Sequence, residues 1–264
     1  MNFLEPIVLD GLASLLWPFC RIGAFLMAMF IFGGGTVPAR VRLLMALTIT
    51  VCMIGSIPKV PANPELFSLD GILTTISQIL VGAGLGFMTQ FLAQAFIIAG
   101  QAVAMQTGLG FASMVDPVSG TNAPVVGQFF NVLTTLIFLA LDGHLVFMRL
   151  LLFSFETIPV GPQIFTPQEL TYLIYFGAVM FQGALAMAIS AICTMLVVNF
   201  TFGVMTRAAP QLNVFSMGFA VSMAAGLLVL WYCLTAFMGN FTLVINALME
   251  STCSLMGTSC SGVW

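Results

Sequence analysis

Long apolar runs, separated by short breaks rich in glycine, proline and polar residues, dominate this chain. A helix needs about 20 apolar residues to cross a bilayer, and most of these runs are long enough. The run at 43–57 is short, and Arg149 and Glu156 interrupt the run at 145–158, which fits an interfacial or partner-packed helix. The apolar runs cover residues 12–32, 43–57, 72–99, 125–141, 145–158, 172–202 and 214–249.

The last two runs flank a short turn with the sequence TRAAPQLN, which puts one base, Arg207, between two long apolar segments. Pro210 cannot continue a helix, and Asn213 is a suitable N-cap for the next one. This ending predicts a helical hairpin with Arg207 at its tip.

The composition indicates that these helices belong to a membrane protein. Apolar residues make up 60% of the chain and charged residues only 6%, whereas about a quarter of a soluble domain is charged. Such a chain cannot cover its surface with polar groups, so lipid or partner subunits must cover it. We therefore expect an all-α membrane protein of long helical hairpins, with very little soluble domain.

The few charges suggest an orientation. With about five or six crossings and an outside N-terminus, Arg40, Arg42 and Arg207 fall on the cytoplasmic side, as the positive-inside bias favours. The N-terminus, MNFLEPIVLD, carries no base, so we expect the first run to be retained rather than cleaved as a signal peptide. The acids that fall outside are Glu5, Asp10, Glu65, Asp70, Glu169 and Glu250.

A linker rich in Gly, Ser, Asp, Pro and Asn follows the third run and stands out from its apolar flanks. Irregular backbone at membrane depth survives only inside protein or along a wet cavity. One interpretation is a re-entrant or pore-lining loop, and the other is a polar connection outside the membrane. Met105, Phe111 and Met114 around the linker fit either a soft apolar constriction or ordinary core.

Arg21 lies within the first apolar run. An arginine near the bilayer centre costs about 2.5–3.5 kcal/mol on insertion scales, so such residues usually face protein or water. We expect Arg21 to be a buried charge that faces protein, and snorkelling to the interface is the alternative.

Small and amide residues mark the third run as a packing element. Gly82 and Gly86, in VGAGLGF, have the four-residue spacing that lets membrane helices approach closely. No strand precedes them, which argues against nucleotide binding. Gln90, Gln94 and Gln101 share one helical face, which fits a helix–helix seam or a stripe facing a pore.

Catalytic chemistry finds little support. His144 is the only histidine, which excludes a histidine-based metal site, and there is no G-x-S-x-G motif, catalytic set, cofactor motif or basic patch for nucleic acid. We expect no catalytic residues, no metal and no cofactor. Cys253 and Cys260, in the polar tail, could pair if that tail faces an oxidising compartment.

Three ordered blocks carry a family resemblance. QTGLGFASMVDPVSG, APVVGQFFNVLTTLIFLALDGHL and RAAPQLNVFSMGF, at 106–145 and 207–219, closely resemble the signatures of the FliR family, a core membrane component of the flagellar type III protein export apparatus. The length and hydropathy fit end to end. Virulence type III secretion systems have a related component, and the V-D-P-V-S-G and G-H-L blocks look like the flagellar branch.

The resemblance implies an architecture beyond these spans. Residues 1–167 would form a FliP-like helical portion, in which a loop at 106–124 would plug the export channel. Residues 168–264 would form a FliQ-like helical hairpin. The hairpin tip at Arg207 would lie near the cytoplasmic entrance of the channel. The plug positions implied in this way are Gly108, Gly110, Phe111, Met114, Asp116 and Pro117.

The resemblance also implies a function. The chain would be a non-enzymatic subunit of the export gate for unfolded flagellar proteins, in a complex with FliP- and FliQ-like subunits and FlhA- and FlhB-like export components. It would lie in the bacterial inner membrane at the flagellar basal body, partly on the periplasmic side. The alternatives are a small-molecule or ion transporter, for which we find no internal repeat or paired buried charges, and an intramembrane hydrolase.

Overall fold

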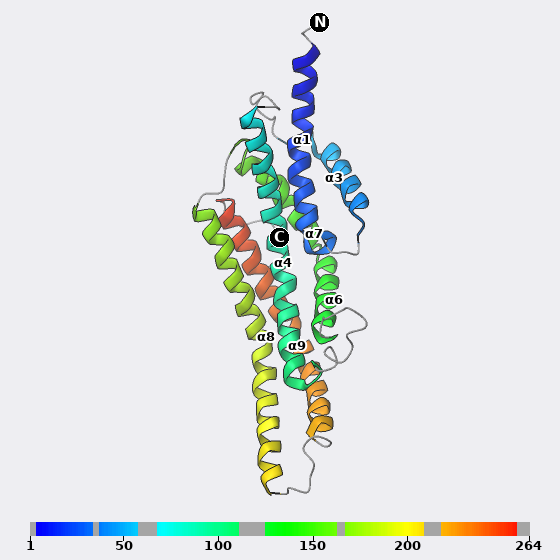
Figure 1. Ribbon diagram of the computed structural model, residues 1–264, viewed down its shortest axis with the longest axis vertical. Coiled ribbons are helices and arrows are strands. Elements are labelled where there is room, and N and C mark those ends of the chain that lie inside the picture. Colours follow the sequence, from blue (N-terminus) through cyan, green and yellow to red (C-terminus); the bar gives the residue numbers. More distant parts are fainter. Residues whose placement is uncertain are drawn as a thin grey trace. The chain divides into compact units, whose positions relative to one another are not determined.

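The computed structural model describes residues 4–33, 37–57, 68–110, 125–162, 167–208 and 218–257 (Figure 1). This part of the chain contains helices and no strand, which confirms the expected all-α class. The helices are α1 (Leu4–Ala28), α2 (Phe30–Gly33), α3 (Ala39–Met53), α4 (Leu69–Thr107), α6 (Val125–Ala140), α7 (Gly143–Thr157), α8 (Pro167–Ala208) and α9 (Phe219–Leu255).

Three helices in the described ranges are long and apolar enough to cross a membrane: Leu69–Thr107, Ile174–Ala208 and Phe219–Leu255. A fourth span results if the bent pair α6 and α7 counts as one. The expected five or six crossings are therefore not reached within these ranges. The first apolar run breaks at Met29, between α1 and α2, and the second forms a helix of only 15 residues, α3.

The chain forms two compact units that are interleaved along the sequence. Unit 1 contains Met1–Phe91, Phe138–Phe176 and Leu248–Trp264, and unit 2 contains Leu92–Ile137 and Gly177–Ala247. α4, α8 and α9 each contribute residues to both units. The boundary at 167/168, which came from the resemblance, coincides with the start of α8 at Pro167, and the division into two ancestral parts stays a prediction.

The chain bends by 68° at the break between α6 and α7, and the residues around this break, from Phe138 onward, belong to unit 1, although most of α6 belongs to unit 2. Asp142 adopts a left-handed conformation with φ 54° at this break. The Phe138 ring occupies the place where a Cβ on the next residue, Gly143, would stand, 2.6 Å from the nearest ring atom. Phe138 also contacts the rings of Phe30 and Phe147. The bend is thus held by packing as well as by backbone geometry.

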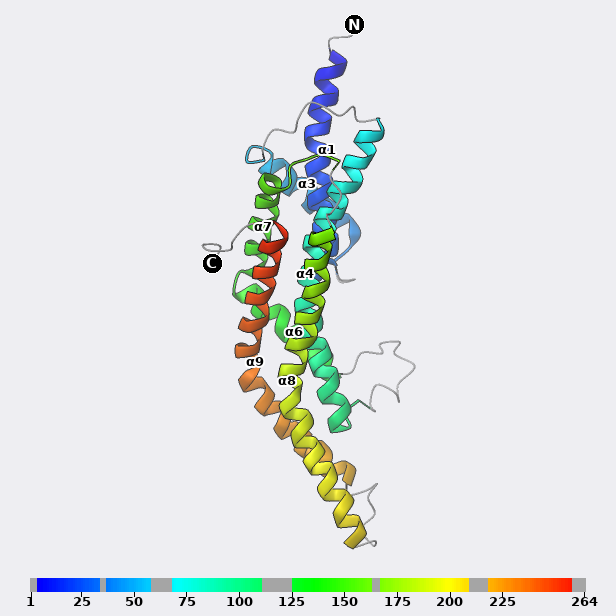
Figure 2. The same ribbon diagram turned by 90° about the vertical axis from the view of Figure 1, so that its left-hand side faces the viewer.

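In unit 2, aromatic residues from three helices form the core. The Phe96 ring of α4 lies 4.7 Å from the Phe237 ring of α9, and Phe130 of α6 meets the same Phe237 ring at 5.6 Å. α8 and α9 lie side by side within this unit in both views (Figure 2), and Gly183 of α8 lies against Val244 of α9. This part of the chain therefore has the helical hairpin that the turn sequence predicted.

Candidate functional site

Arg21 is completely buried within unit 1 and makes hydrogen bonds to three residues. Its Nε donates to Oε1 of Gln78 at 2.8 Å, its Nη1 to the backbone oxygen of Ser154 at 2.9 Å and its Nη2 to the backbone oxygen of Ile158 at 2.9 Å. The guanidinium also lies 4.3 Å from the centroid of the Phe155 ring, a cation–π distance. Arg21 thus faces protein in every direction the structure describes.

The electrostatic partner of Arg21 is a helix end rather than an acid. Ser154 and Ile158 carry carbonyls at the C-terminal end of α7, where unpaired carbonyls and the helix dipole concentrate negative charge. No carboxylate within the described ranges forms an ion pair with Arg21. The arginine therefore fixes the end of α7 to α1 and α4, and the arrangement offers no acid–base pair for catalysis.

The seam between α1 and α4 continues on both sides of Arg21. A Cβ on Gly82 would collide with the backbone oxygen of Arg21, and one on Gly86 would lie 2.6 Å from the backbone oxygen of Phe25. The backbones thus approach at both positions of the G-x-x-x-G spacing. The Trp17 indole donates to Thr75 Oγ1 at 3.3 Å, one turn further along the seam.

At the other end of the seam, side chains of α4 form hydrogen bonds with backbone groups at the break between α1 and α2. The backbone N–H of Phe30 donates to Thr89 Oγ1 at 3.2 Å, and Gln90 Nε2 donates to the backbone oxygen of Ala28 at 2.8 Å. These are backbone groups that the interrupted helix leaves without its own partners. Gln90 therefore lies in a helix–helix seam, one of the two interpretations of the amide stripe.

The linker leaves α4 from a fixed end in unit 2. Gly108 has a φ of 79°, the left-handed conformation that commonly ends a helix, and Gly110 N–H donates to the backbone oxygen of Ala104 at 2.9 Å. The Phe219 ring lies 3.4 Å from the Cβ position of Gly108. Both glycines lie at the end of α4, and their role in the movement of a plug stays a prediction.

The two helices that flank the linker cross closely. A Cβ on Gly100 of α4 would lie 2.8 Å from the Cα of Gly127 in α6, and one on Gly127 would lie 3.2 Å from the backbone oxygen of Ile97. Residues 111–124 therefore connect two helices that are in backbone contact eleven residues before the linker and three residues after it. We call this crossing the linker base.

The remaining predicted positions lie apart from these sites. Phe111, Met114, Asp116 and Pro117 lie outside the described residues. Arg207 is exposed in the last turn of α8, and the turn after it, at 209–217, is also outside. Cys253 is disulfide-bonded. Cys260, which could pair with it if the tail faces an oxidising compartment, lies outside the described residues.

Sequence reasoning missed the partners of Arg21 and the linker base. Gln78, Ser154 and Ile158 come from two other helices or helix ends, and no spacing rule connects them to residue 21. Gly100 and Gly127 are single glycines in separate apolar runs, so neither forms a recognisable motif. The one available signal was the amide of Gln78, an unusual residue for an apolar run.

Among the described residues, no group of three or more His, Cys, Asp or Glu side chains could hold a metal ion. His144 Nδ1, Ser77 Oγ and Gln78 Nε2 are buried without a hydrogen-bond partner. These atoms are single and separate from any enzymatic constellation. Packing, rather than reaction chemistry, organises this part of the chain.

Comparison with known proteins gives one consistent family. Residues 12–248 match the family described as bacterial export proteins, family 1. The flagellar biosynthetic protein FliR of Escherichia coli (strain K12) is 35% identical over 212 residues, which cover 80% of each chain. That of Pectobacterium carotovorum subsp. carotovorum is 33% identical over 224 residues, 84% of this chain and 85% of the relative. That of Bacillus subtilis (strain 168) is 29% identical over 262 residues, 96% of this chain and 99% of the relative.

The family match spans both compact units, and these relatives extend over most of their own length as well. It includes α1 with Arg21, the α1–α4 seam, the linker base and most of α9. The chain therefore belongs to the FliR family of bacterial export proteins.

Proposed function

We propose that this chain is a non-enzymatic subunit of the flagellar type III export gate and helps to form and close its channel for unfolded flagellar proteins. The observation that carries the proposal is the family match over residues 12–248, whose relatives are named flagellar biosynthetic proteins. The helices long enough to span a membrane agree with a membrane-embedded component. The proposed location is the inner membrane at the flagellar basal body, partly on the periplasmic side.

The linker base supports a closing role for the segment it connects. A closing segment needs anchors that stay fixed while the segment blocks the channel or leaves it. The contacts between Gly100 and Gly127, and between Gly108 and Phe219, provide such anchors on both sides of residues 111–124. We propose that Phe111 and Met114 face the channel and that Asp116 and Pro117 set the turn of the plug.

The exposed surface of the hairpin supports a role inside a complex. In the span windows of α8 and α9, 22% of residues are buried, against 50% in the window of α4. Large side chains such as Phe200, Trp231 and Tyr232 are therefore left outside this chain. We propose that FliP- and FliQ-like subunits cover much of this surface, with FlhA- and FlhB-like components nearby and Arg207 near the cytoplasmic entrance.

The bend between α6 and α7 favours one alternative, a small-molecule or ion transporter. Broken membrane helices with polar residues at the break are typical of transporter binding sites, and Asp142 lies exposed at this bend. However, Arg21 is paired with carbonyls rather than with an acid, and transporters usually pair their buried charges. The export-gate proposal therefore explains more of the observations.

Co-expression with the neighbouring FliP- and FliQ-like proteins tests the assembly. Native mass spectrometry of the purified complex should give one copy of this chain in a defined larger complex. A monomer or homo-oligomer that does not bind these partners would contradict the export-gate proposal and favour the transporter.

A second experiment tests the closing role. Residues 111–124 are replaced by a Gly/Ser segment of equal length, and ion leakage is measured across membranes that contain the assembled complex. The complex should stay intact, because the linker base is unchanged, while leakage rises. Met114→Ala should raise leakage, whereas Met27→Ala, at an exposed position of α1, should not. An assembled, export-deficient complex without leakage would exclude the plug.

A further inference from the structure

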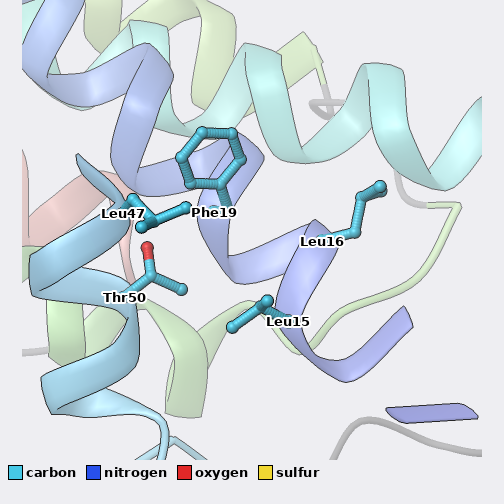
Figure 3. Close-up of a pocket in the computed structure, with 5 residues that line it drawn as sticks. All are labelled: Leu15, Leu16, Phe19, Leu47 and Thr50. Carbon is cyan, nitrogen blue, oxygen red and sulfur yellow. The ribbon is translucent and has the colours of Figure 1, made fainter. Parts of the chain in front are cut away.

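An apolar groove lies between α1 and α3, within unit 1. It is lined by Leu15, Leu16 and Phe19 of α1 and by Leu47 and Thr50 of α3, and it encloses about 130 Å³ (Figure 3). The Thr50 hydroxyl donates to the backbone oxygen of Ala46 at 2.6 Å, so Thr50 presents its methyl group to the groove. With no free polar group on its walls, the groove offers nothing to hold water.

The size of the groove restricts what can occupy it. A helix with its side chains is about 10 Å wide, too wide for a cavity of about 130 Å³. An apolar cavity of about 150 Å³ holds one benzene molecule, which is comparable to a few methylene groups. A segment of one hydrocarbon chain therefore fits the groove, and a partner helix does not enter it.

Arg40 lies at one end of the face of α3 that lines the groove. Arg40, Leu43, Leu47 and Thr50 follow each other at spacings of three and four residues and so share one face of the helix. At about 1.5 Å per residue, Leu47 and Thr50 lie about 10 and 15 Å further along the axis than Arg40. Half of the hydrocarbon core of a bilayer is about 15 Å, so an arginine at the headgroup level puts the groove at the depth of the acyl chains.

The charge at this end of α3 has no counterpart among the residues that the structure describes. Neither Arg40 nor Arg42 forms an ion pair with any described residue, and α3 contains no acid. Arg42 donates to the backbone oxygen of Val37 through Nε and Nη2, at 3.2 and 2.9 Å, while Arg40 is exposed. Two arginines at the beginning of a helix oppose its dipole, so a bound anion there would be favoured.

We infer that the α1–α3 groove binds one anionic phospholipid, with its phosphate at Arg40 and one acyl chain along the stripe into the groove. Arginine guanidinium is well suited to phosphate oxygens, and the apolar walls suit the chain. The inference requires only that α3 lies at the membrane, and it does not depend on the export role.

Native mass spectrometry of the delipidated full chain in mild detergent, titrated with dioleoyl phosphatidylglycerol or dioleoyl phosphatidylcholine, tests this site. We expect one phosphatidylglycerol to be held about fivefold more tightly than phosphatidylcholine. Arg40→Gln should lower the phosphatidylglycerol affinity about fivefold, while Arg207→Gln, which removes an exposed arginine of α8, should leave it unchanged.

A second pair of variants tests the groove itself. Leu47→Trp should fill it and weaken the binding of both lipids, whereas Leu44→Trp, on an exposed face of α3 outside the groove lining, should have no effect. Equal binding of the two lipids, equal effects of the two arginine variants, or an unaffected Leu47→Trp would each overturn the inference. Loss of the lipid when the chain is co-purified with its partner subunits would also overturn it, because the groove would then be a subunit interface.

Discussion

The α1–α4 seam and the α8–α9 hairpin are both made of long apolar helices, but they bury their surfaces differently. In the seam, Gly82 and Gly86 bring backbones into contact, and Trp17, Arg21 and Gln90 bond across it. In the hairpin, Gly183 packs against Val244, while most of the neighbouring surface stays exposed. One interface is completed by this chain alone, and the other leaves most of its surface to lipid or partner subunits.

This difference teaches where a substitution should act. In the seam, polar and small residues satisfy the chain's own backbone, so changes there should lower the stability of the isolated chain. On the outer face of the hairpin, large apolar side chains such as Trp231 are mostly exposed, so changes there should affect assembly instead. The following variants test this contrast, from the largest expected change in unfolding free energy to the smallest.

Arg21→Ala should cause the largest loss. It removes a fully buried side chain together with its hydrogen bonds to Gln78 and to the carbonyls of Ser154 and Ile158, which should cost about 3–5 kcal/mol of unfolding free energy. SDS titration of the purified full chain measures this loss. Arg207→Ala, at an exposed arginine, is the control and should stay within about 0.5 kcal/mol. Equal losses of unfolding free energy in the two variants would mean that Arg21 does not stabilise the seam.

Gly82→Ala should destabilise the chain by about 1–3 kcal/mol, because the new methyl group meets the backbone oxygen of Arg21 and forces the helices apart. Alanine is the better helix former, so a loss here would be due to helix packing alone. The same titration checks it, and an unchanged or higher stability would mean that α1 and α4 do not approach at this residue.

Gly177→Ala should have the opposite sign. No atom lies within 4 Å of the Cβ position of Gly177 in α8. The variant should therefore gain up to about 1 kcal/mol from helix propensity. Gly203→Ala, which is equally open, serves as a second instance. A loss in both would indicate contacts on this face of α8 in the isolated chain.

Trp231→Ser should have the smallest effect on the chain alone. Trp231 of α9 is 69% exposed, so unfolding free energy should change by less than about 0.5 kcal/mol. The fraction of chain that co-purifies with FliP- and FliQ-like subunits should fall, because a large apolar contact is removed. Phe237→Ser, at a buried position six residues away, should instead lower stability. Unchanged co-purification of the Trp231 variant would indicate that lipid, rather than partner subunits, covers this face of the hairpin.

The helices were predictable because membrane-embedded backbone has few alternatives to the helix. The apolar run at 125–141 corresponds to α6, Val125–Ala140, and the Asp142-Gly143 pair after it marks the observed bend. The break at Met29 could not be predicted, because no proline or glycine marks it. Its backbone groups are satisfied by Thr89 and Gln90, about 60 residues away.

The sites were harder to predict from the sequence than the helices, because they depend on tertiary contacts. The bilayer cost of a charge indicated that Arg21 faces protein, but its acceptors are 57, 133 and 137 residues away along the chain. A carbonyl acceptor has no sequence signature, since every residue has one. The linker base depended on two isolated glycines in the same way. The plug residues from Phe111 onwards stay a prediction.

The linker base also makes the segment at 111–124 a natural cassette. Because Gly100 and Gly127 already hold the flanking helices together, the length of the intervening chain has little influence on their register. Doubling a flexible loop adds only about 0.6 kcal/mol of closure entropy. A reporter peptide or a protease site could therefore be inserted there with the helices unchanged, and its accessibility would report on whether the proposed channel is open or closed.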